Sequence, residues 1–493
     1  MLEIYSKRTL TCQPTDNPYM LDHWLPTDTE WTASPPQLQV IGEIPKDLNG
    51  VYLRNGHNQV HAPIGKYHPF DGDGMVHGMH IEGGKATYRN RFVRTTGFLA
   101  EEAAGESLWP GIIEPRRAVR RGWGSIGAMK DNAGTDVKVH AGRALTAMSQ
   151  CSEPYRMDPI TLKTEGPDPS WTRTLGERGI CSHMQVDPHT GEMMFFNFGE
   201  QAPYFIYGVV SADNKLVHYE PIELPHATWP HDMGMTQNYC VIHDLSMFFD
   251  VEGLKKGQHR LKFHRDVPAR FGVIPRFGTS RDVKWFEGLP CYILHLANTY
   301  EVGDEIVMDG AIQTNPVPDL SALPKDGYAR MHALLSMDLQ ETRMHRWRFN
   351  MKTGQTTEED LDDEVTEFSM INTQVKGRPN RYVYNALPKP EWKLVGLKKY
   401  DWQTGKTQRW EAPEGCFVSE TPFAARDGAV DEDDGYLITY VTNLNSGKGE
   451  CAIFDAHDIA PGPICRIILP GHIPMGAHAC WAPQSSLLSG AVA

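Results

Sequence analysis

The sequence predicts an all-β fold, either a barrel or a propeller. Two observations support this prediction. Turn motifs recur between short alternating runs rich in Tyr, Phe, Trp and Val, and helical periodicity is scarce along the 493 residues. Asp, Asn, Pro and Gly give each motif its turn geometry, so we expect a β-hairpin at each one. The motifs are EGGKATYRNRF from Glu82, MDPITLKTEG from Met157, VDPHTGEMMFF from Val186, SADNKLVHYEP from Ser211, NMKTGQT from Asn350 and YDWQTGKTQRW from Tyr400.

The composition restricts the class of protein. Hydrophobic residues make up 40% of the chain, which is enough for a large core, and the net charge is −14. This charge argues against nucleic acid or an anionic membrane surface as the main partner. No apolar run approaches the ~20 residues that span a bilayer, and the segment MLEIYSKRTLTCQPTDN lacks the apolar core of a signal peptide. We therefore expect a cytoplasmic protein.

The cysteines indicate neither a disulfide framework nor a zinc site. Their number is odd, their spacing is scattered and no CxxC pair occurs. We expect them to pack as small apolar residues, including the two that flank candidate ligands. They are Cys12, Cys151, Cys181, Cys240, Cys291, Cys416, Cys451, Cys465 and Cys480.

Four histidines stand in contexts that each indicate the rim of a short β-strand. They are His183 in SHMQVDPHTGEM, His231 in PHDMGMTQNY, His295 in CYILHLANTYEVGDE and His478 in IPMGAHACW. No carboxylate or thiolate pattern competes with them. A set of neutral imidazoles suits a redox metal such as iron(II), because it leaves the metal its full positive charge and open coordination positions. The alternative for any single histidine is a structural or surface role, since the chain has 21 of them.

The sequence motifs around the four histidines resemble those of the carotenoid cleavage oxygenase family. Further shared motifs are GEIPKDLNGVYLRNGHN, FDGDGMVHG, RFVRT, DVKWF, EFSMIN and EDDGYL, so the resemblance covers nearly the whole chain. It implies a seven-bladed β-propeller that holds a non-haem Fe(II) on His183, His231, His295 and His478. His231 is preferred over His243, which also precedes an Asp, because only His231 lies before the turn MGMTQN as in the family.

The family fold implies a single domain over residues 1–493 with insertions that form a dome above the metal. The candidates for this dome are residues 97–130, 302–332 and 386–396, which are rich in Pro, Met, Leu and Trp. The segment EEAAGESLW within the first of them is expected to form a short helix. An apolar tunnel mouth in such a dome would also suit peripheral contact with a membrane that supplies a lipid substrate.

The resemblance also implies residues that orient the liganding imidazoles, since a metal-bound histidine normally donates its second N–H to an acceptor. The family uses three glutamates. Glu367 in TEFSMIN and Glu420 in VSETPF match two of them, whereas Gln150 in AMSQCSEPY stands where the third is expected. Gln can accept through its carbonyl oxygen, but the local charge rises by one unit and the paired histidine becomes a weaker donor to iron.

In the family, the methyl group of a threonine crowds one vacant coordination position of the metal. Thr135 in KDNAGTDV matches this threonine. The substrate positions are matched by Phe70, Ile112 and Ser149. Relatives that cleave hydroxystilbenes or phenylpropenes often have Tyr and Lys at the last two positions to hold a phenolate. Burying a phenolate without such partners costs several kcal/mol, which favours an apolar polyene.

The expected function is therefore Fe(II)-dependent cleavage of a C=C bond of a carotenoid or apocarotenoid by O2, giving two carbonyl products. Two alternatives remain. One is the same cleavage of an aryl alkene, a stilbenoid or a phenylpropene such as 4-vinylguaiacol or isoeugenol, and the other is a non-cleaving isomerase or lipid binder. The expected partners are an apolar alkene and O2, without nucleic acid, and the oligomeric state is open.

Overall fold

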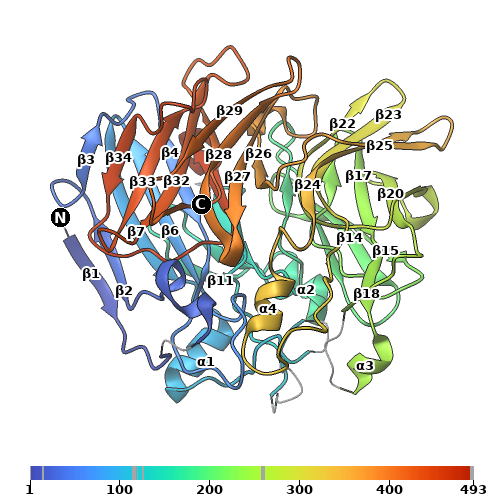
Figure 1. Cartoon of the computed structure of the whole chain (residues 1–493), viewed down its shortest axis with the longest axis horizontal. Helices are drawn as coiled ribbons and strands as arrows, with labels where there is room; N and C mark the ends of the chain where they lie inside the picture. The colour runs from blue at the N-terminus through green and yellow to red at the C-terminus, as the bar shows by residue number, and fades with distance from the viewer. Residues whose placement is uncertain are drawn as a thin grey trace.

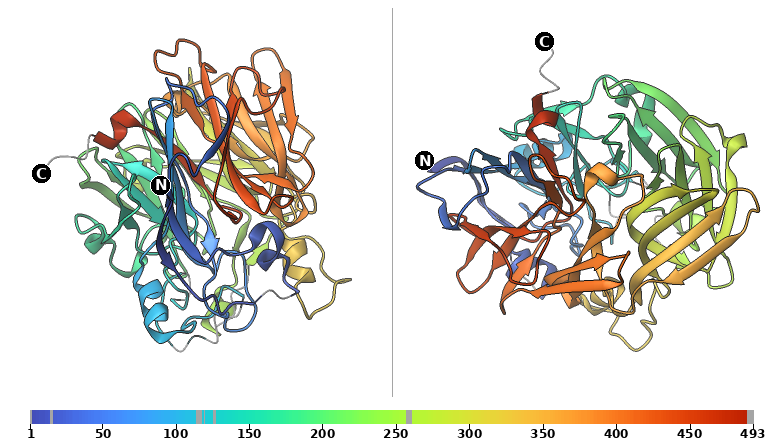
Figure 2. Two further views of the ribbon diagram at one scale, coloured as in Figure 1. Left: turned by 90° about the vertical axis from the view of Figure 1, so that its left-hand side faces the viewer. Right: turned by 90° about the horizontal axis from the view of Figure 1, so that it is seen from above.

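The computed structural model describes residues 2–13, 16–113, 118, 120–124, 127–256 and 261–488, without the side chains of residues 173, 177, 254 and 488. Its sheets are arranged in a ring around a central axis, as the right-hand view of Figure 2 shows. Every strand pairing within the named strands is antiparallel, and most sheets are built from strands that follow one another in the sequence. The prediction of an all-β propeller is confirmed.

Five sheets of the described chain have four strands each. In pairing order, the first sheet contains β11 (Thr164–Pro167), β10 (Tyr155–Met157), β9 (Arg143–Ala147) and β8 (Asp136–His140), and the second contains β12 (Gln185–Val186), β13 (Met193–Phe198), β14 (Tyr204–Val210) and β15 (Leu216–Glu223). The third contains β16 (Gly234–Met235), β17 (Tyr239–Asp244), β20 (Ala269–Pro275) and β21 (Lys284–Gly288), and the fourth contains β22 (Tyr292–Val302), β23 (Glu305–Gln313), β24 (Thr342–Asn350) and β25 (Thr356–Asp360). The fifth contains β26 (Glu367–Met370), β27 (Tyr382–Lys389), β28 (Lys393–Asp401) and β29 (Lys406–Glu411).

Two larger sheets join the two ends of the chain, and a two-stranded sheet stands apart. The seven-stranded sheet contains β1 (Leu2–Lys7), β2 (Thr29–Ala33), β7 (Lys85–Phe92), β6 (Asp73–Glu82), β4 (Gly50–Arg54), β35 (Ala479–Pro483) and β5 (His57–Asn58). The six-stranded sheet contains β3 (Gln39–Gly42), β34 (Cys465–Ile468), β33 (Lys448–Asp455), β32 (Gly435–Asn443), β30 (Cys416–Val418) and β31 (Phe423–Ala425), and the small sheet pairs β18 (Met247–Phe249) with β19 (Leu261–Phe263). The pairs β4·β35 and β3·β34 close the ring, because each joins an N-terminal to a C-terminal strand.

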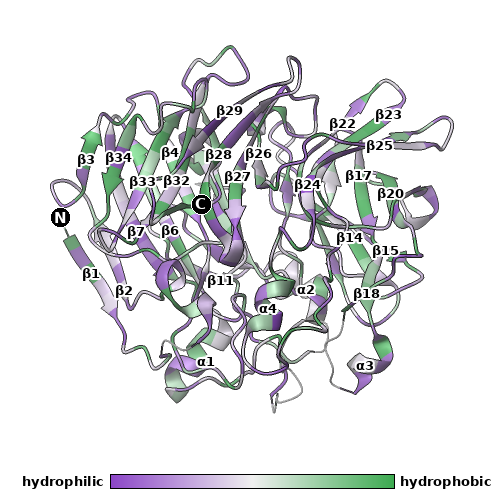
Figure 3. Ribbon diagram, in the orientation of Figure 1, coloured by the Kyte–Doolittle hydropathy of each residue, from purple (hydrophilic) through white to green (hydrophobic). Residues whose placement is uncertain are grey.

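All six turn motifs connect adjacent antiparallel strands, as predicted. In four of them the first Asp or Asn accepts a hydrogen bond from the backbone N–H two residues later. The N···O distances are 2.9–3.0 Å for Asp158, Asp187, Asn350 and Asp401. This side-chain turn explains why the motif is a reliable hairpin signal. Figure 3 shows the outer strand β29 as largely hydrophilic, in agreement with its exposed positions.

The described helices are short and few. They are α1 (Thr96–Ala104), α2 (Thr172–Leu175), α3 (Val251–Lys255), α4 (Ala329–Leu334) and α5 (Gln484–Leu488), with 3-10 turns at Pro18–Met20, Asp22–Trp24, Gly176–Arg178, Ser280–Asp282, Thr373–Val375 and Pro390–Trp392. In Figure 1, α1, α4 and α3 are spread from left to right along the bottom of the view, below most of the strands. None of the helices within the described ranges is long and apolar enough to cross a membrane.

The proposed insertion boundaries need correction. Of the segment EEAAGESLW, in which a helix was expected, only the first four residues are helical, as the end of α1 (Thr96–Ala104). Residues 302–332, however, contain all of β23, and residues 386–396 are mostly β27, a 3-10 turn and β28. Buried strands and covering loops are both rich in Met, Leu and Trp, so composition alone does not separate them.

Candidate metal centre and substrate cavity

The four histidines lie in, or just before, the terminal strands of four different sheets. His295 lies within β22, and His478 directly precedes β35. His183 and His231 stand two and three residues before β12 and β16. His183 has a left-handed backbone with φ 66°, which is rare for a residue with a side chain and is often found at functional sites.

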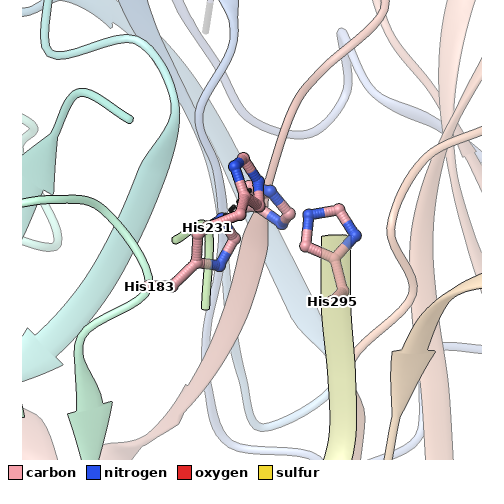
Figure 4. Close-up of side chains that lie close together, drawn as sticks. His183, His231 and His295 are labelled. Atoms are coloured by element: carbon pink, nitrogen blue, oxygen red, sulfur yellow. Dashed lines mark hydrogen bonds between the residues drawn. The ribbon is translucent and has the colours of Figure 1, made fainter. Parts of the chain in front are cut away.

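The imidazoles converge on one point. Each offers one ring nitrogen, and these four nitrogens all lie within 4.8 Å of one another. Figure 4 shows the rings of His183, His231 and His295 turned toward one another, with a dashed line between the first two. This line joins two Nε2 atoms that are 3.1 Å apart. All four side chains are buried, so the nitrogens face one another rather than solvent.

Two carboxylates orient two of the rings. Glu367 Oε2 lies 2.7 Å from Nδ1 of His295, and Glu420 Oε1 lies 3.0 Å from Nδ1 of His478. Both glutamates are buried, and each also accepts a backbone N–H, from Phe368 and from Ala479. The Nδ1 bonds leave Nε2 of His295 without a partner in the described structure, turned toward the other histidines. This arrangement matches a metal ligand with an acceptor behind it.

The site favours the neutral form of three of the four imidazoles. Burial, reinforced by the neighbouring histidines, holds the pKa of His183, His231 and His478 well below the ordinary value. Burial would also lower the pKa of His295, but the carboxylate of Glu367 outweighs it and raises that pKa. A neutral imidazole keeps the lone pair that a metal needs, so the donor set fits a divalent transition metal.

Gln150 is buried and follows Ser149 of the cavity wall in the sequence, but its side-chain oxygen accepts no hydrogen bond from a histidine of the described chain. Its Oε1 has no hydrogen-bond partner within the described ranges, and the same holds for Nδ1 of His231. These two orphaned atoms are complementary, since the carbonyl oxygen accepts and the ring N–H donates. The bond expected at Gln150 is therefore absent from this structure.

Thr135 is buried directly behind His478. Its carbonyl oxygen accepts the backbone N–H of His478 at 3.2 Å, and its Oγ1 accepts the backbone N–H of Ser149 at 3.2 Å. Thr135 therefore links the segment that carries His478, through its carbonyl oxygen, to the segment that carries Ser149 and Gln150, through its hydroxyl group.

A large cavity of about 580 Å³ reaches His231. All three residues assigned to substrate contact line it, namely Phe70, Ile112 and Ser149. Most of its wall is apolar, and much of that wall comes from residues that the sequence did not single out. These are Ile113, Trp229, Met247, Leu261, Tyr292, Leu294, Pro316, Val317, Leu320, Leu334, Leu335 and Trp392.

A second, polar cavity of about 90 Å³ reaches His183, His295 and His478. Lys138, Lys376 and Asp232 line it, and none of them was predicted. Lys138 pairs with Asp136 at 2.9 Å, and Asp232 accepts the backbone N–H groups of Met233 and Leu296. These contacts fix the backbone next to the histidines and do not involve the imidazole rings.

His243 lies away from this site. It is part of β17, is fully buried and packs against Phe271, and neither ring nitrogen has a partner within the described chain. The choice of His231 over His243 for the cluster agrees with this geometry.

The chain matches known proteins over nearly its whole length. The family model described as RPE65, retinal pigment epithelial membrane protein, matches residues 24–483. A carotenoid 9,10(9',10')-cleavage dioxygenase 1 of Pisum sativum is 32% identical over 94% of this chain and 91% of its own length. An isoeugenol monooxygenase of Pseudomonas nitroreducens is 28% identical over 95% and 98%.

Solved structures share the fold. A lignostilbene dioxygenase of Pseudomonas brassicacearum superposes with a TM-score of 0.81 at 25% identity, over 96% of this chain and 99% of its own. A cobalt-substituted apocarotenoid oxygenase of Synechocystis gives the same TM-score and identity over 97% and 98%. With the buried histidine cluster and the full-length match, the chain belongs to the RPE65 family of carotenoid cleavage oxygenases, an enzyme family of the dioxygenase type.

Proposed function

We propose that this protein cleaves a C=C bond of a carotenoid or apocarotenoid with O2, dependent on Fe(II), and releases two carbonyl products. One observation carries the proposal: four buried imidazoles converge within 4.8 Å beside a large apolar cavity. The first element supplies a metal site and the second a place for an apolar alkene. The reaction balances without a further reductant, because one alkene and one O2 give two carbonyl groups.

His183, His231, His295 and His478 would hold the metal. Imidazole suits zinc, copper, nickel and iron alike, so the donor set alone does not select iron. Iron is favoured because the reaction uses O2 and because the chain belongs to an oxygenase family. The cobalt-substituted relative supports an exchangeable metal at this site. The chemistry that iron(II) supplies when bound is activation of O2 toward the double bond.

The residues of this chain position the reactants. Glu367 and Glu420 fix the rings of His295 and His478 through their Nδ1 atoms. We assign to the methyl group of Thr135 the role of narrowing the space next to His478. The apolar wall around Phe70 excludes water from the alkene, which protects the reacting centre from side reactions.

The lining favours a polyene over a phenol. Ile112 and Ser149 face the cavity at the two positions where a phenolate would need a hydroxyl and an ammonium group. Neither position offers such a group to a phenolate, and a buried charge without a partner costs several kcal/mol; the lysine of the cavity lining, Lys262, stands at an exposed position of β19. A polyene needs only apolar contact, and the cavity wall provides it.

The aryl alkene alternative has support of its own. Relatives named isoeugenol monooxygenase and lignostilbene dioxygenase match this chain over at least 95% of its length. In that case the ring oxygen would bind as a neutral group and not as a phenolate. The third alternative, a non-cleaving isomerase or lipid binder, would use the same cavity without consuming O2.

We also propose that the seven sheets with four or more strands are the seven blades of the propeller, in a single domain. The sheet composition supports this count, because the two-stranded sheet of β18 and β19 is too small to form a blade. We assign the roof of the cavity to this small sheet, residues 314–335 and the turn at Pro390–Trp392, since each contributes lining residues.

The test is turnover by purified protein loaded with Fe(II) under nitrogen and then exposed to O2. A panel of apocarotenals, a carotenoid, lignostilbene and isoeugenol is assayed for carbonyl products by mass spectrometry. We expect paired carbonyl fragments from the polyenes and at least tenfold slower cleavage of the phenols. Faster cleavage of isoeugenol or lignostilbene would select the aryl alternative, and isomerised substrate without O2 uptake would select the third.

A further inference from the structure

Trp392 stands in a strained turn beside the cavity. It ends the 3-10 turn Pro390–Trp392 between β27 and β28, and both Glu391 (φ 66°) and Trp392 (φ 55°) have left-handed backbone. Side chains larger than glycine rarely adopt this conformation, least of all two in succession. Such strain persists only where the surrounding structure holds it, and it is concentrated at binding and catalytic sites.

Two segments far apart in the sequence hold this turn in place. The carbonyl oxygen of Glu391 accepts hydrogen bonds from Nε1 of Trp24 at 2.9 Å and from the ring of His23 at 3.2 Å. The indole Nε1 of Trp392 donates to the carbonyl oxygen of Leu335, directly after α4, at 2.8 Å. The indole is therefore fixed in position and orientation, which a residue that merely fills the core does not require.

The fixed indole faces the aromatic residues next to the histidines. Its ring centroid lies 5.4 Å from that of Phe70 and 5.9 Å from that of Phe368, both in edge-to-face geometry. Phe368 is itself left-handed (φ 56°), and its ring lies 5.1 Å from His295 and 5.6 Å from His478. Phe70, Trp392 and Phe368 thus form an unbroken aromatic wall from the cavity to the imidazoles.

The rest of this cavity is lined mostly by aliphatic side chains. It continues along the small sheet and residues 316–320, including Met247, Leu261 and Leu320. Aliphatic side chains on surface segments accommodate a long apolar chain, whereas interlocked aromatic rings do not yield to one. A substrate in this cavity would therefore meet a rigid wall at the aromatic rings and more room along the aliphatic residues.

From this geometry we infer that Trp392 is a specificity-determining residue that limits the substrate arm at the aromatic wall next to the imidazoles. The long arm lies along β18, β19 and residues 316–320, and the cleaved bond is near one end of the polyene. This inference rests on the proposed alkene cleavage and specifies which bond is cleaved.

The experiment compares the parent protein with Trp392→Leu and Trp392→Phe. Linear polyene aldehydes of graded length are the substrates, and the lengths of both carbonyl fragments give the position of the cleaved bond. We expect the parent to cleave near one end. Trp392→Leu should move the cut toward the centre and raise kcat/KM at least tenfold for polyenes with a bulky ring on the short side, relative to those without. Trp392→Phe keeps an aromatic ring and should shift the cut less.

Trp410→Leu is the matched control, because this indole packs against Phe454 outside the cavity lining. It should leave the fragment lengths unchanged. Central cleavage by the parent, or identical fragments from the parent and both Trp392 variants, would overturn the inference.

A second measurement separates this inference from the proposed reaction. Binding of the same polyenes to metal-free protein is followed by their absorbance shift. If Trp392→Leu binds the bulky-ended polyenes at least tenfold more tightly while no variant cleaves any alkene, the role of Trp392 stands and the proposed cleavage fails. If both variants bind the series as the parent does, the role of Trp392 is refuted whatever the activity.

Discussion

Glu420 holds His478 at two points of the same segment: its Oε1 lies 3.0 Å from the ring Nδ1, and its Oε2 accepts the backbone N–H of Ala479. The carboxylate therefore fixes both the direction of the imidazole and the start of β35 that carries it. Burial raises the pKa of Glu420 to about 7, and the ammonium group of Lys138 opposes that shift. The ionised form of this carboxylate is therefore supported by its cationic neighbour.

Replacing Glu420 with Gln should weaken the site without destroying it. The amide can still accept from one donor, but its NH2 group would face an N–H where the carboxylate accepted one. We expect a 10–100-fold loss of metal affinity or turnover, the usual effect of removing an acceptor behind a liganding histidine. Metal titration and steady-state kinetics measure it. Glu414→Gln, at an exposed position, is the control, and a Glu420→Gln protein equal to the parent would refute the role of this carboxylate.

Replacing His478 with Ala should remove metal and activity together. The variant loses one of the four converging ligands, so one coordination position of the metal is left without its histidine. Metal analysis of anaerobically purified protein should find near-zero iron, against full occupancy in a His457→Ala control, whose side chain is 68% exposed. Full iron content in His478→Ala would exclude this residue from the site. The same loss is expected for alanine at His183, His231 and His295.

His243 should make the protein sensitive to acid. Burial lowers its pKa to about 3, whereas the same ring titrates near 6.5 in the unfolded chain. Between these values the unfolded state binds one more proton than the folded state, so stability falls as the pH falls. The loss is about 1.4 kcal/mol per pH unit for this group.

His243→Leu should therefore flatten the pH dependence. The thermal midpoint of the variant should fall less between pH 7 and pH 5 than that of the parent. Calorimetry at both pH values measures this difference directly, and parallel decreases in the two proteins would show that His243 does not titrate on unfolding.

The sequence was most informative where a signal is local. The turn motif at Asp187 and the motif around His183 are each a continuous stretch of sequence. A hairpin needs its turn residues at fixed offsets, so such a stretch is enough to predict it. The role of Glu367 behind a liganding histidine was also predicted from its local motif, TEFSMIN. Trp392 and Trp229 were missed, because a cavity wall is assembled from segments far apart in the chain and no local pattern records which of them meet.

The segment boundaries failed for a related reason. Residues 302–332 share their apolar composition with covering loops, yet Glu305–Gln313 is paired on both sides by β22 and β24. Strand pairing depends on partners that a composition count does not see. The absence of a bond from Gln150 to a histidine is likewise a matter of side-chain geometry.

Gln150 gives the last prediction. Its Oε1 and the Nδ1 of His231 are both buried without partners in the described structure, and a hydrogen bond between them would satisfy both. We expect this bond to form when metal draws the His231 ring into line, so that Gln150 acts as the neutral counterpart of Glu367 and Glu420. The parent protein should then bind iron, and Gln150→Glu should keep it bound while changing the rate only modestly.

The opposite case is a decayed site, in which the parent binds iron poorly and Gln150→Glu restores occupancy and cleavage together. The intact histidines and the two glutamates already paired to them favour the first case, since relaxed selection would damage several positions at once. Metal analysis of the two proteins purified side by side under nitrogen decides between them: near-zero iron in the parent with near-full iron in Gln150→Glu would establish decay.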